Sequence, residues 1–181
     1  MRVLLHTCCG PCATACEPRL REEGHDVTLF FSNCNIDTRE EFEKRLAQAR
    51  KLGEADGVEV IADAYDHADW LETVARGFED APEKGARCAR CFRYSLARAA
   101  AYAAAHGFDA ITTSLTVSPH KVSRMVFEAG HAAVEGTKPA FLEVDFKKKD
   151  GFLRSLRRTA ELGLYRQSYC GCEFSQGKDA N

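Results

Sequence analysis

The sequence predicts an α/β protein in which a parallel sheet of about five strands is flanked by helices. Short apolar runs alternate with longer amphipathic segments along the chain, as in proteins whose helices cover both faces of a sheet. The run Val27–Phe31 is almost continuously apolar, which is typical of a buried parallel strand. Because no repeat or long linker divides the chain, residues 1–175 are expected to form a single α/β metal-binding catalytic domain and residues 176–181 a disordered tail.

The first half of the chain is expected to contain three strands and two helices. The first strand begins almost at the start of the chain, and the helix after it is expected to stop at Gly24, since glycine favours helix ends. The second helix is charged and amphipathic. In chain order the expected elements are strand Val3–His6, helix Cys12–Glu23, strand Val27–Phe31, helix Arg39 to about Ala55, and strand Val58–Ile61.

The second half repeats the alternation with longer helices. Proline at Ser118-Pro119 is well placed in the first turn of a helix, and Gly107 ends an alanine-rich helix. The expected elements are helix His67–Arg76, a polar loop over Gly77–Arg87, helix Cys91–His106, strand Ala110–Ser114, a helix starting at Ser118, strand Phe141–Val144, helix Phe152–Leu162, and a tail from Gly163.

Length, composition and net charge limit the classes of function that the chain can have. The chain has 181 residues, of which 45% are apolar and 29% charged, as in an ordinary globular domain. A formal net charge of −2 provides no global basic field, so any RNA binding must come from local patches. No apolar run reaches the roughly 20 residues of a membrane span, and no secretory signal pattern is present. A cytoplasmic protein without membrane partners is therefore expected.

Seven of the nine cysteines fall in three tight clusters far apart in sequence. Reduced thiols are the rule in the cytoplasm, and an odd count of cysteines argues against a pure disulfide framework. The clusters favour a single metal site assembled on folding, since thiolates are ligands for zinc and for iron–sulfur centres. The seven candidate ligands are Cys8, Cys9, Cys12, Cys88, Cys91, Cys170 and Cys172.

The position of the clusters predicts where this site forms. Sites in open α/β sheets lie beyond the carboxyl ends of the strands, and the first cluster directly follows the first strand. The clusters at Cys8 and Cys88 also lie near predicted helix starts, where unpaired N–H groups stabilise thiolates. The third cluster lies in the irregular tail, which is expected to fold back over the strand ends.

Three interpretations of the thiols compete. The Cys88/Cys91 and Cys170/Cys172 pairs together match a tetrahedral zinc site, as in a zinc-stabilised nucleic-acid-binding module. The segment from Cys9 to Cys12 matches a thiol–disulfide exchange motif. Seven thiols exceed the needs of either, so an iron–sulfur centre is favoured.

The two remaining cysteines have no clustered partner. Cys16 shares a helix face with Cys12 and is expected to pack in the core. Cys34 follows the second strand and is given only a minor chance of being a ligand. His6 is interpreted either as a hydrogen-bonded core histidine or as a functional one.

Motifs spread over nearly the whole chain resemble the QueH family of epoxyqueuosine reductases. The most specific is Tyr165-Arg166-Gln167-Ser168-Tyr169-Cys170-Gly171-Cys172. The others are Leu5 to Cys12, Phe30 to Ile36, the Cys88/Cys91 pair, and Thr112 to Leu115 with Ser118-Pro119. One departure is Cys34, where the family pattern has proline, while Asn33 and Asn35 are kept. The position of Cys12 varies between cysteine and aspartate in the family, which suits an iron ligand.

The resemblance implies an oxidoreductase that removes the epoxide oxygen of epoxyqueuosine at the wobble position of tRNA to give queuosine. It implies a sheet of the nucleotide-binding (HUP-like) type, a [4Fe-4S] cluster and an additional mononuclear iron. The partners would be the modified tRNA and an unidentified electron donor. We interpret the excess of thiols as ligands for a second metal that binds the epoxide oxygen as a Lewis acid. The spacing does not divide the seven cysteines between the two metals.

Other residues are candidates for proton donation and for tRNA binding. Asp145 and Tyr169 are the candidate proton donors, although a loop acid or a helix cap is the more ordinary role for Asp145. The candidate residues for contact with tRNA are Lys147, Lys148, Lys149, Arg154, Arg157, Arg158 and Arg166. Adenylating chemistry is disfavoured because the loop after the first strand has too few glycines and hydroxyls to cradle a phosphate.

Overall fold

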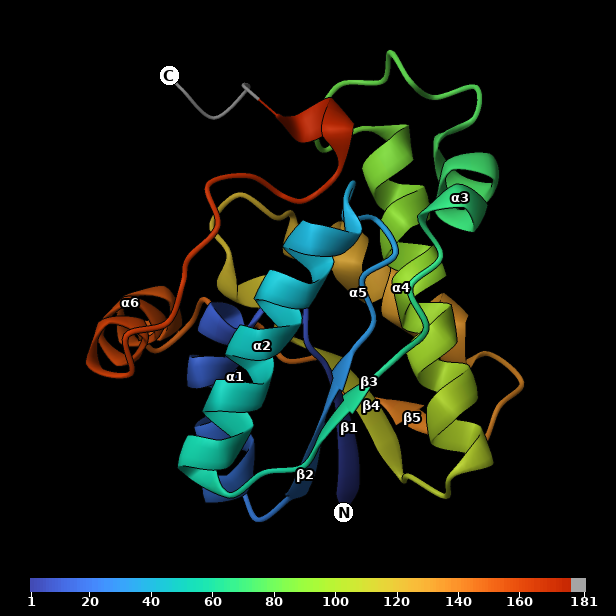
Figure 1. Cartoon of the computed structure of the whole chain (residues 1–181). Helices are drawn as coiled ribbons and strands as arrows, with labels where there is room; N and C mark the ends of the chain where they lie inside the picture. The colour runs from blue at the N-terminus through green and yellow to red at the C-terminus, as the bar shows by residue number, and fades with distance from the viewer. Residues whose placement is uncertain (177–181) are drawn as a thin grey trace.

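A five-stranded, all-parallel sheet in the order β3-β2-β1-β4-β5 lies at the centre of residues 1–176, the part of the chain that the computed structural model describes (Figure 1). The predicted α/β class and parallel sheet are thus confirmed. The order reverses between β1 and β4, as in doubly wound nucleotide-binding folds, which bind ligands at this point. The strands are β1 (Arg2–His6), β2 (Asp26–Phe31), β3 (Val60–Ala62), β4 (Ala110–Thr113) and β5 (Ala140–Phe141).

Helices cover both faces of the sheet. In Figure 1, α1 and α2 lie on one side, and α4 and α5 on the other. None of the helices within residues 1–176 has the length and hydropathy of a membrane span. The helices are α1 (Gly10–Glu22), α2 (Arg39–Asp56), α3 (His67–Trp70, continued by a π-turn over Leu71–Ala75), α4 (Ala86–Ala105), α5 (Ser123–Val134) and α6 (Gly151–Glu161), with 3-10 turns over Ser114–Val117 and Glu173–Ser175.

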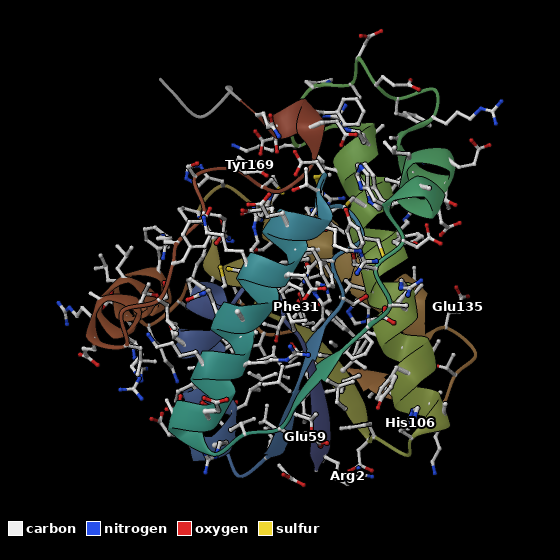
Figure 2. The ribbon with its side chains drawn as sticks, viewed as in Figure 1. Arg2, Phe31, Glu59, His106, Glu135 and Tyr169 are labelled. Atoms are coloured by element: carbon white, nitrogen blue, oxygen red, sulfur yellow. The ribbon has the colours of Figure 1, made fainter. Side chains whose placement is uncertain are left out.

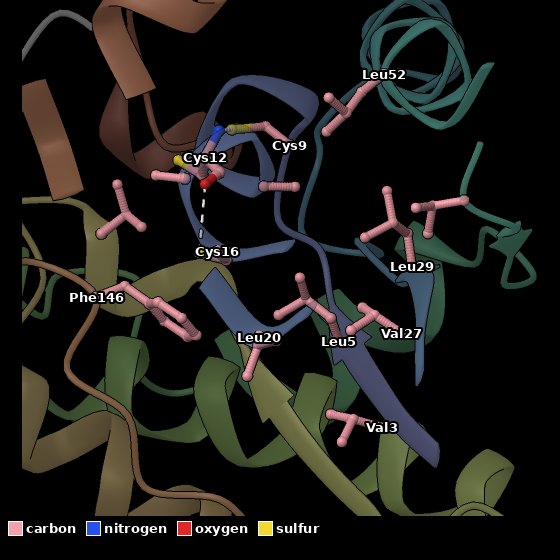
Figure 3. Close-up of a cluster of buried hydrophobic side chains, with 14 of the residues drawn as sticks. Val3, Leu5, Cys9, Cys12, Cys16, Leu20, Val27, Leu29, Leu52 and Phe146 are labelled. Carbon is pink, nitrogen blue, oxygen red and sulfur yellow. Dashed lines mark hydrogen bonds between the residues drawn. The ribbon is translucent and has the colours of Figure 1, made fainter. Parts of the chain in front are cut away.

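Alternation along β1 divides the core between the two faces. Val3 and Leu5 are fully buried in a cluster with Leu20 of α1 (Figure 3). Leu4 points the other way and packs with Ala99 and other small residues of α4. Burying an aliphatic side chain of this size contributes about 1.5–3 kcal/mol, so this strand anchors both layers.

Helix α4 begins at Ala86, five residues before the predicted start at Cys91, so the prediction of a loop up to Arg87 was too long. The physical reason is the buried side chain of Arg87. One of its terminal nitrogens, Nη1, donates to the carbonyls of Phe78, Glu79 and Ala81 at 2.8–3.0 Å. These bonds tie the polar loop to the first turn of α4, and Cys88 therefore lies within the helix.

The prediction of a helix starting at Ser118-Pro119 was wrong, because α5 begins at Ser123. Residues 118–121 form a turn in which the backbone N–H of Lys121 donates to the Ser118 carbonyl at 3.2 Å. The Ser118 hydroxyl accepts from the backbone of His120, also at 3.2 Å. Proline also suits the second position of such a turn, so the same residues that predict a helix start serve a turn here.

The fifth strand is shorter than predicted, since only Ala140–Phe141 pair with β4 rather than Phe141–Val144. The carbonyls that follow β5 accept hydrogen bonds from side chains. The hydroxyl of Thr112 donates to the Leu142 carbonyl, and that of Thr116 to the Val144 carbonyl, both at 2.9 Å. Smaller shifts occur at β3, which starts two residues after the predicted Val58, and at α1, which starts two residues before Cys12.

The predicted return of the tail over the sheet is confirmed. Tyr169 lies at the end of the molecule opposite to Arg2 and Glu59, which flank the amino ends of the strands (Figure 2). The backbone N–H of Asp37, in the loop after β2, donates to the Gly171 carbonyl at 2.9 Å. Of the predicted disordered tail, Gln176 is described and its side chain contacts Asp37, whereas residues 177–181 lie outside the described residues.

Gly10, the first residue of α1, allows this helix to touch the backbone of α2. A Cβ atom at Gly10 would lie 2.7 Å from the carbonyl carbon of Gln48. Because the contact is with backbone, no side-chain rotation relieves it. Glycine between Cys9 and Pro11 is thus required for the close approach of α1 and α2.

We expect Gly10→Ala to destabilise the protein by about 1–3 kcal/mol, the usual cost of overpacking a core. Urea unfolding at an unchanged m value measures this cost. Ala47→Leu is the matched control, because it enlarges an exposed residue of α2 and should cost about 0.5 kcal/mol or less. Equal effects of the two substitutions would contradict the proposed contact.

Candidate metal centre

Cys8, Cys9 and Cys12 form a compact sulfur triad between the end of β1 and the first turn of α1. Their three Sγ atoms lie within 4.8 Å of one another, close enough to bind one metal ion. The Sγ atoms of Cys8 and Cys9 are 4.0 Å apart. Ser114, just after β4, fixes the position of Cys8: its hydroxyl accepts from the Cys8 backbone at 3.0 Å and contacts the Cys8 sulfur at 3.3 Å.

Cys9 is the member of the triad that most favours the thiolate. It caps α1, and its Sγ accepts from the backbone N–H of Cys12 at 3.4 Å. Hydrogen bonds from the thiols of Cys12 and Cys8, from the Gln167 side chain and from this N–H lower the pKa of Cys9 well below its ordinary value. The pKa of Cys12 is raised by its hydrogen bonds to Cys8 and Cys9 and by burial. A helix N-terminus favours negative charge in the same way.

The other four cysteines form a second group. Cys88 and Cys91 lie one turn apart on α4, and Cys170 and Cys172 come from the tail. Burial raises the pKa of the Cys91 thiol, and the negative charges of Cys170, Cys172 and Cys88 raise it further. Cys91 packs in the same buried cluster as Cys172, so folding brings the tail beside α4, although about 80 residues separate the two cysteines.

A cavity of about 630 Å³ opens between the two sulfur groups. Its wall includes the whole triad together with Cys91 of α4 and Cys170 of the tail. Phe92 and Tyr169 add aromatic surface, and Asn33, Asn35, Ser118 and His120 add polar groups. A cavity of this size, part apolar and with a few convergent polar groups, is typical of a ligand site.

The two remaining cysteines are engaged elsewhere. Cys16 is fully buried in the core, where its thiol donates to the Cys12 carbonyl at 3.4 Å (Figure 3). Cys34 packs beside Cys172 and Trp70. Its sulfur contacts the Ala64 carbonyl at 3.3 Å and the backbone N–H of Asp66 at 3.4 Å. Both thiols therefore have structural partners, and neither belongs to the sulfur triad.

Arg45 of α2 holds the tail in place. Its side chain is only 1% exposed, and its Nε donates to Glu41 at 2.6 Å. The terminal nitrogens donate to the carbonyls of Cys170 at 3.0 Å and Tyr169 at 3.4 Å. Gly171 completes the contact: it has a φ of +133°, and a Cβ there would lie 3.2 Å from the Arg45 guanidinium. The tail cysteines are thus positioned by a buried cation.

Lys121 lies beside the second sulfur group. Its Nζ is 2.9 Å from the Cys170 sulfur and 3.9 Å from a Glu83 carboxylate oxygen. Burial alone would lower the pKa of Lys121, but the negative charges of Cys170, Cys88 and Glu83 outweigh it and raise that pKa. The side chain therefore carries its positive charge next to the thiols.

The two predicted proton donors occupy different environments. Tyr169 lines the cavity, but its hydroxyl donates to Asp37 at 2.9 Å, and burial together with this bond raises its pKa to about 12. Asp145 is not among the residues that line the cavity within the described chain. Its carboxylate accepts from the Lys147 backbone at 3.1 Å.

The basic residues that were predicted to contact tRNA lie in different environments. Lys147 points inward, and its Nζ donates to the Lys121 carbonyl at 3.1 Å. Arg158 pairs with Asp56 at 2.6 Å, and Arg154 lies 3.8 Å from Glu22, in a groove between α1 and α6. Arg166 is exposed at the cavity. Within residues 1–176, no carboxylate pairs with Lys148, Lys149 or Arg157.

Both ring nitrogens of His6 lie within hydrogen-bonding distance of protein groups. Its Nδ1 lies 2.9 Å from the Thr113 hydroxyl and its Nε2 lies 3.1 Å from the Ser32 carbonyl. Burial lowers its pKa to about 4, so the ring is neutral at physiological pH. The ring joins β1 to the ends of β2 and β4 beneath the cavity.

Three residues of the site escaped the sequence analysis. Arg45 had a detectable signal, because it shares the buried face of α2 with Phe42, Leu46 and Ala49 at helical spacing. Gln167 was quoted only as part of a motif, although its Oε1 is buried without a partner among the described residues. Nothing in the spacing around Lys121 indicated that it would contact Cys170.

The donor set suits a soft metal or an iron–sulfur centre. All seven predicted ligands are sulfur, and they lie in two adjacent groups rather than in one tetrahedral set. The cavity wall also carries nitrogen and oxygen groups, of which those of His6, Asn33 and Tyr169 are hydrogen-bonded to the protein. The residues present therefore fit a thiolate-bound metal centre.

Comparisons with known proteins agree with this description. The family model described as "Epoxyqueuosine reductase QueH" matches residues 3–178. A protein of that name from Streptococcus pyogenes is 34% identical over 179 residues, which cover 96% of this chain and 69% of that protein. The proteins of the same name from Acinetobacter baylyi and Dehalococcoides mccartyi are 34% and 33% identical and are covered over 80% and 92% of their lengths.

We expect Arg45→Met to destabilise the protein by about 3–5 kcal/mol, because it leaves Glu41 and two tail carbonyls buried without their partner. Urea unfolding measures the loss, and amide exchange at Cys170 to Cys172 should accelerate. Arg39→Met is the matched control on the same helix. The Arg39 side chain is 64% exposed, and its pair with Glu43 is worth about 0.5 kcal/mol or less. Unchanged exchange in the tail of Arg45→Met would contradict the positioning role.

Proposed function

The chain belongs to the QueH family of epoxyqueuosine reductases and is an oxidoreductase, and we propose that it converts epoxyqueuosine at the wobble position of tRNA into queuosine. The observation that carries the proposal is the cavity of about 630 Å³ whose wall combines sulfur atoms from both cysteine groups. A substrate in this cavity would contact the triad and the second group at once. In the reaction, the epoxide oxygen leaves as water, two carbon–oxygen bonds break and a carbon–carbon double bond forms, which consumes two electrons and two protons.

We assign a [4Fe-4S] cluster to Cys88, Cys91, Cys170 and Cys172, and an additional iron to Cys8, Cys9 and Cys12. The assignment is supported by the compact triad and by the packing of the tail cysteine Cys172 in one cluster with Cys91 of α4. When bound, such a cluster supplies electrons singly, and an iron beside it supplies Lewis acidity toward an oxygen. Cys12 suits the iron because its position varies with aspartate in the family resemblance described above.

The protein's own residues hold and orient the substrate in this proposal. A wobble nucleoside must leave its stack to reach the cavity, and aromatic walls such as those of Phe92 and Tyr169 favour an unstacked base. The buried Oε1 of Gln167 is an acceptor ready for an N–H or O–H group of the nucleoside. Hydrogen bonds from Ser114 and Gln167 keep Cys8 and Cys9 in place.

Tyr169 and Arg166 are the predicted substrate residues that the cavity favours. Tyr169 is on the wall, whereas the Asp145 carboxylate is paired with Lys147. Arg166 is exposed at the cavity and its guanidinium stacks 5.2 Å from the Phe152 ring, so it can meet phosphate without losing a carboxylate partner. We therefore propose Arg166 with the exposed Lys148 as phosphate contacts, and rank Arg154 and Arg158 below them because both are near acidic groups.

Thiol–disulfide exchange is the second candidate, favoured by the lowered pKa of Cys9 at a helix N-terminus. It uses only Cys9 and Cys12 and gives no role to the four cysteines of the second group. A zinc-bound module is distinguished from the reductase by its lack of colour and from the exchange protein by its bound metal.

We expect protein purified without oxygen to be brown, to contain iron and acid-labile sulfide, and to convert epoxyqueuosine tRNA into queuosine tRNA with a one-electron reductant. Mass analysis of the nucleosides measures the conversion. Failure of an iron-loaded sample to convert this tRNA would argue against the function, and colourless protein with stoichiometric zinc would argue for the binding module.

We expect Cys172→Ala and Cys12→Ala to lose different metals. Cys172→Ala should lose sulfide and visible absorption, because it removes a cluster ligand. Cys12→Ala should keep both but lose the iron that is unaccompanied by sulfide, and with it turnover. Iron, sulfide and absorbance assays measure the difference, with Cys16→Ala as the buried-cysteine control that keeps both metals. Normal metal content and turnover in Cys12→Ala would refute the seven-ligand site.

A further inference from the structure

Lys121 is a buried cation next to the tail cysteines. Its side chain is 11% exposed, and its Nζ lies 2.9 Å from the Cys170 sulfur. The ammonium donates to the sulfur in a short, charge-assisted hydrogen bond. Glu83 lies farther away, at 3.9 Å, so the shortest polar contact of the ammonium is with sulfur.

The surrounding structure fixes Lys121 in this position. Its backbone N–H closes the turn that begins at Ser118, and its carbonyl accepts from Lys147 at 3.1 Å. Lys147 also donates to Ser123 at 2.5 Å and lies 3.8 Å from Asp145. The apolar stem of Lys121 passes Phe92, with Nζ 6.0 Å from the ring centroid. A flexible lysine is thus held at both its backbone and its head group.

A buried cation costs free energy unless an anion compensates it. One carboxylate at 3.9 Å is a weak partner, whereas four thiolates would provide ample negative charge. Hydrogen bonds to cluster sulfurs, and nearby charge, are among the factors that set the reduction potential of iron–sulfur centres. A cation stabilises the reduced form more, because that form carries one more negative charge.

We propose that Lys121 is a positioning residue that raises the reduction potential of the centre held by Cys170 through its ammonium–sulfur hydrogen bond. The inference rests on the proposed function, since it requires an iron–sulfur cluster at the second cysteine group. The step concerned is the uptake of one electron from an external one-electron reductant, with no bond made or broken. Lys121 makes that uptake more favourable before the substrate reacts.

The test is an anaerobic redox titration of the reconstituted holoprotein, followed by electron paramagnetic resonance, with dithionite as reductant. In Lys121→Met the ratio of reduced to oxidised cluster at a fixed solution potential should fall about tenfold. This fall corresponds to a reduction potential about 59 mV more negative for one electron. Lys121→Arg keeps the charge and should stay close to the original potential. Lys138→Met, an exposed lysine before the amino end of β5, is the matched control and should change nothing.

The outcomes separate this inference from the function on which it rests. An unchanged potential in Lys121→Met, with normal iron and sulfide, would overturn the inference and leave the reductase intact. Loss of the cluster in Lys121→Met and in Lys121→Gln would also overturn it, because the lysine would then be needed for assembly. Failure of the unaltered protein to hold a cluster would overturn both proposals.

Discussion

Gathering several cysteine sulfurs at one place is the constraint on which the rest of this structure depends. Like charges repel strongly in a buried site, so each sulfur needs donors or cations close to it. The first turn of α1 and Gln167 stabilise Cys9, and Lys121 faces Cys170. The parallel sheet provides the place, because its carboxyl edge brings the end of β1, the start of α1 and the turn after β4 together.

A second consequence concerns how the site assembles. Its proposed ligands come from three segments of the chain, and the last of these reaches the sheet only through the tail. The tail has little regular secondary structure, so few of its carbonyls accept backbone hydrogen bonds. The Arg45 side chain donates hydrogen bonds to two of these carbonyls instead. A buried guanidinium with several acceptors is stable only when all of them are present. Docking of the tail would therefore complete the proposed metal site.

Local pattern predicted the parallel sheet, most of the long helices and the place of the first cysteine cluster, because periodicity and strand-end placement are local properties. Prediction from local pattern failed where a side chain distant in sequence determines where a helix or strand begins or ends. Arg87 extends α4 backward by binding loop carbonyls, and Thr112 ends β5 by taking a carbonyl from the ladder. The roles of Arg45 and Lys121 depend on the docked tail, which no spacing along α2 or along the turn at Ser118 reveals. The proposed division of the cysteines between two metals likewise rests on three-dimensional neighbours.

The tail motif joins metal binding to substrate binding. Gln167 and Tyr169 line the cavity, while Cys170, only a few residues on, belongs to the second sulfur group. A shift of the tail that moved Cys170 away from Lys121 would also move the cavity wall, because Arg45 holds Tyr169 and Cys170 through one guanidinium. In the proposed reductase, the wall that orients the nucleoside is thus complete only when the electron-supplying ligands are in place. Such coupling restricts the residues that the segment from Tyr165 to Cys172 can tolerate.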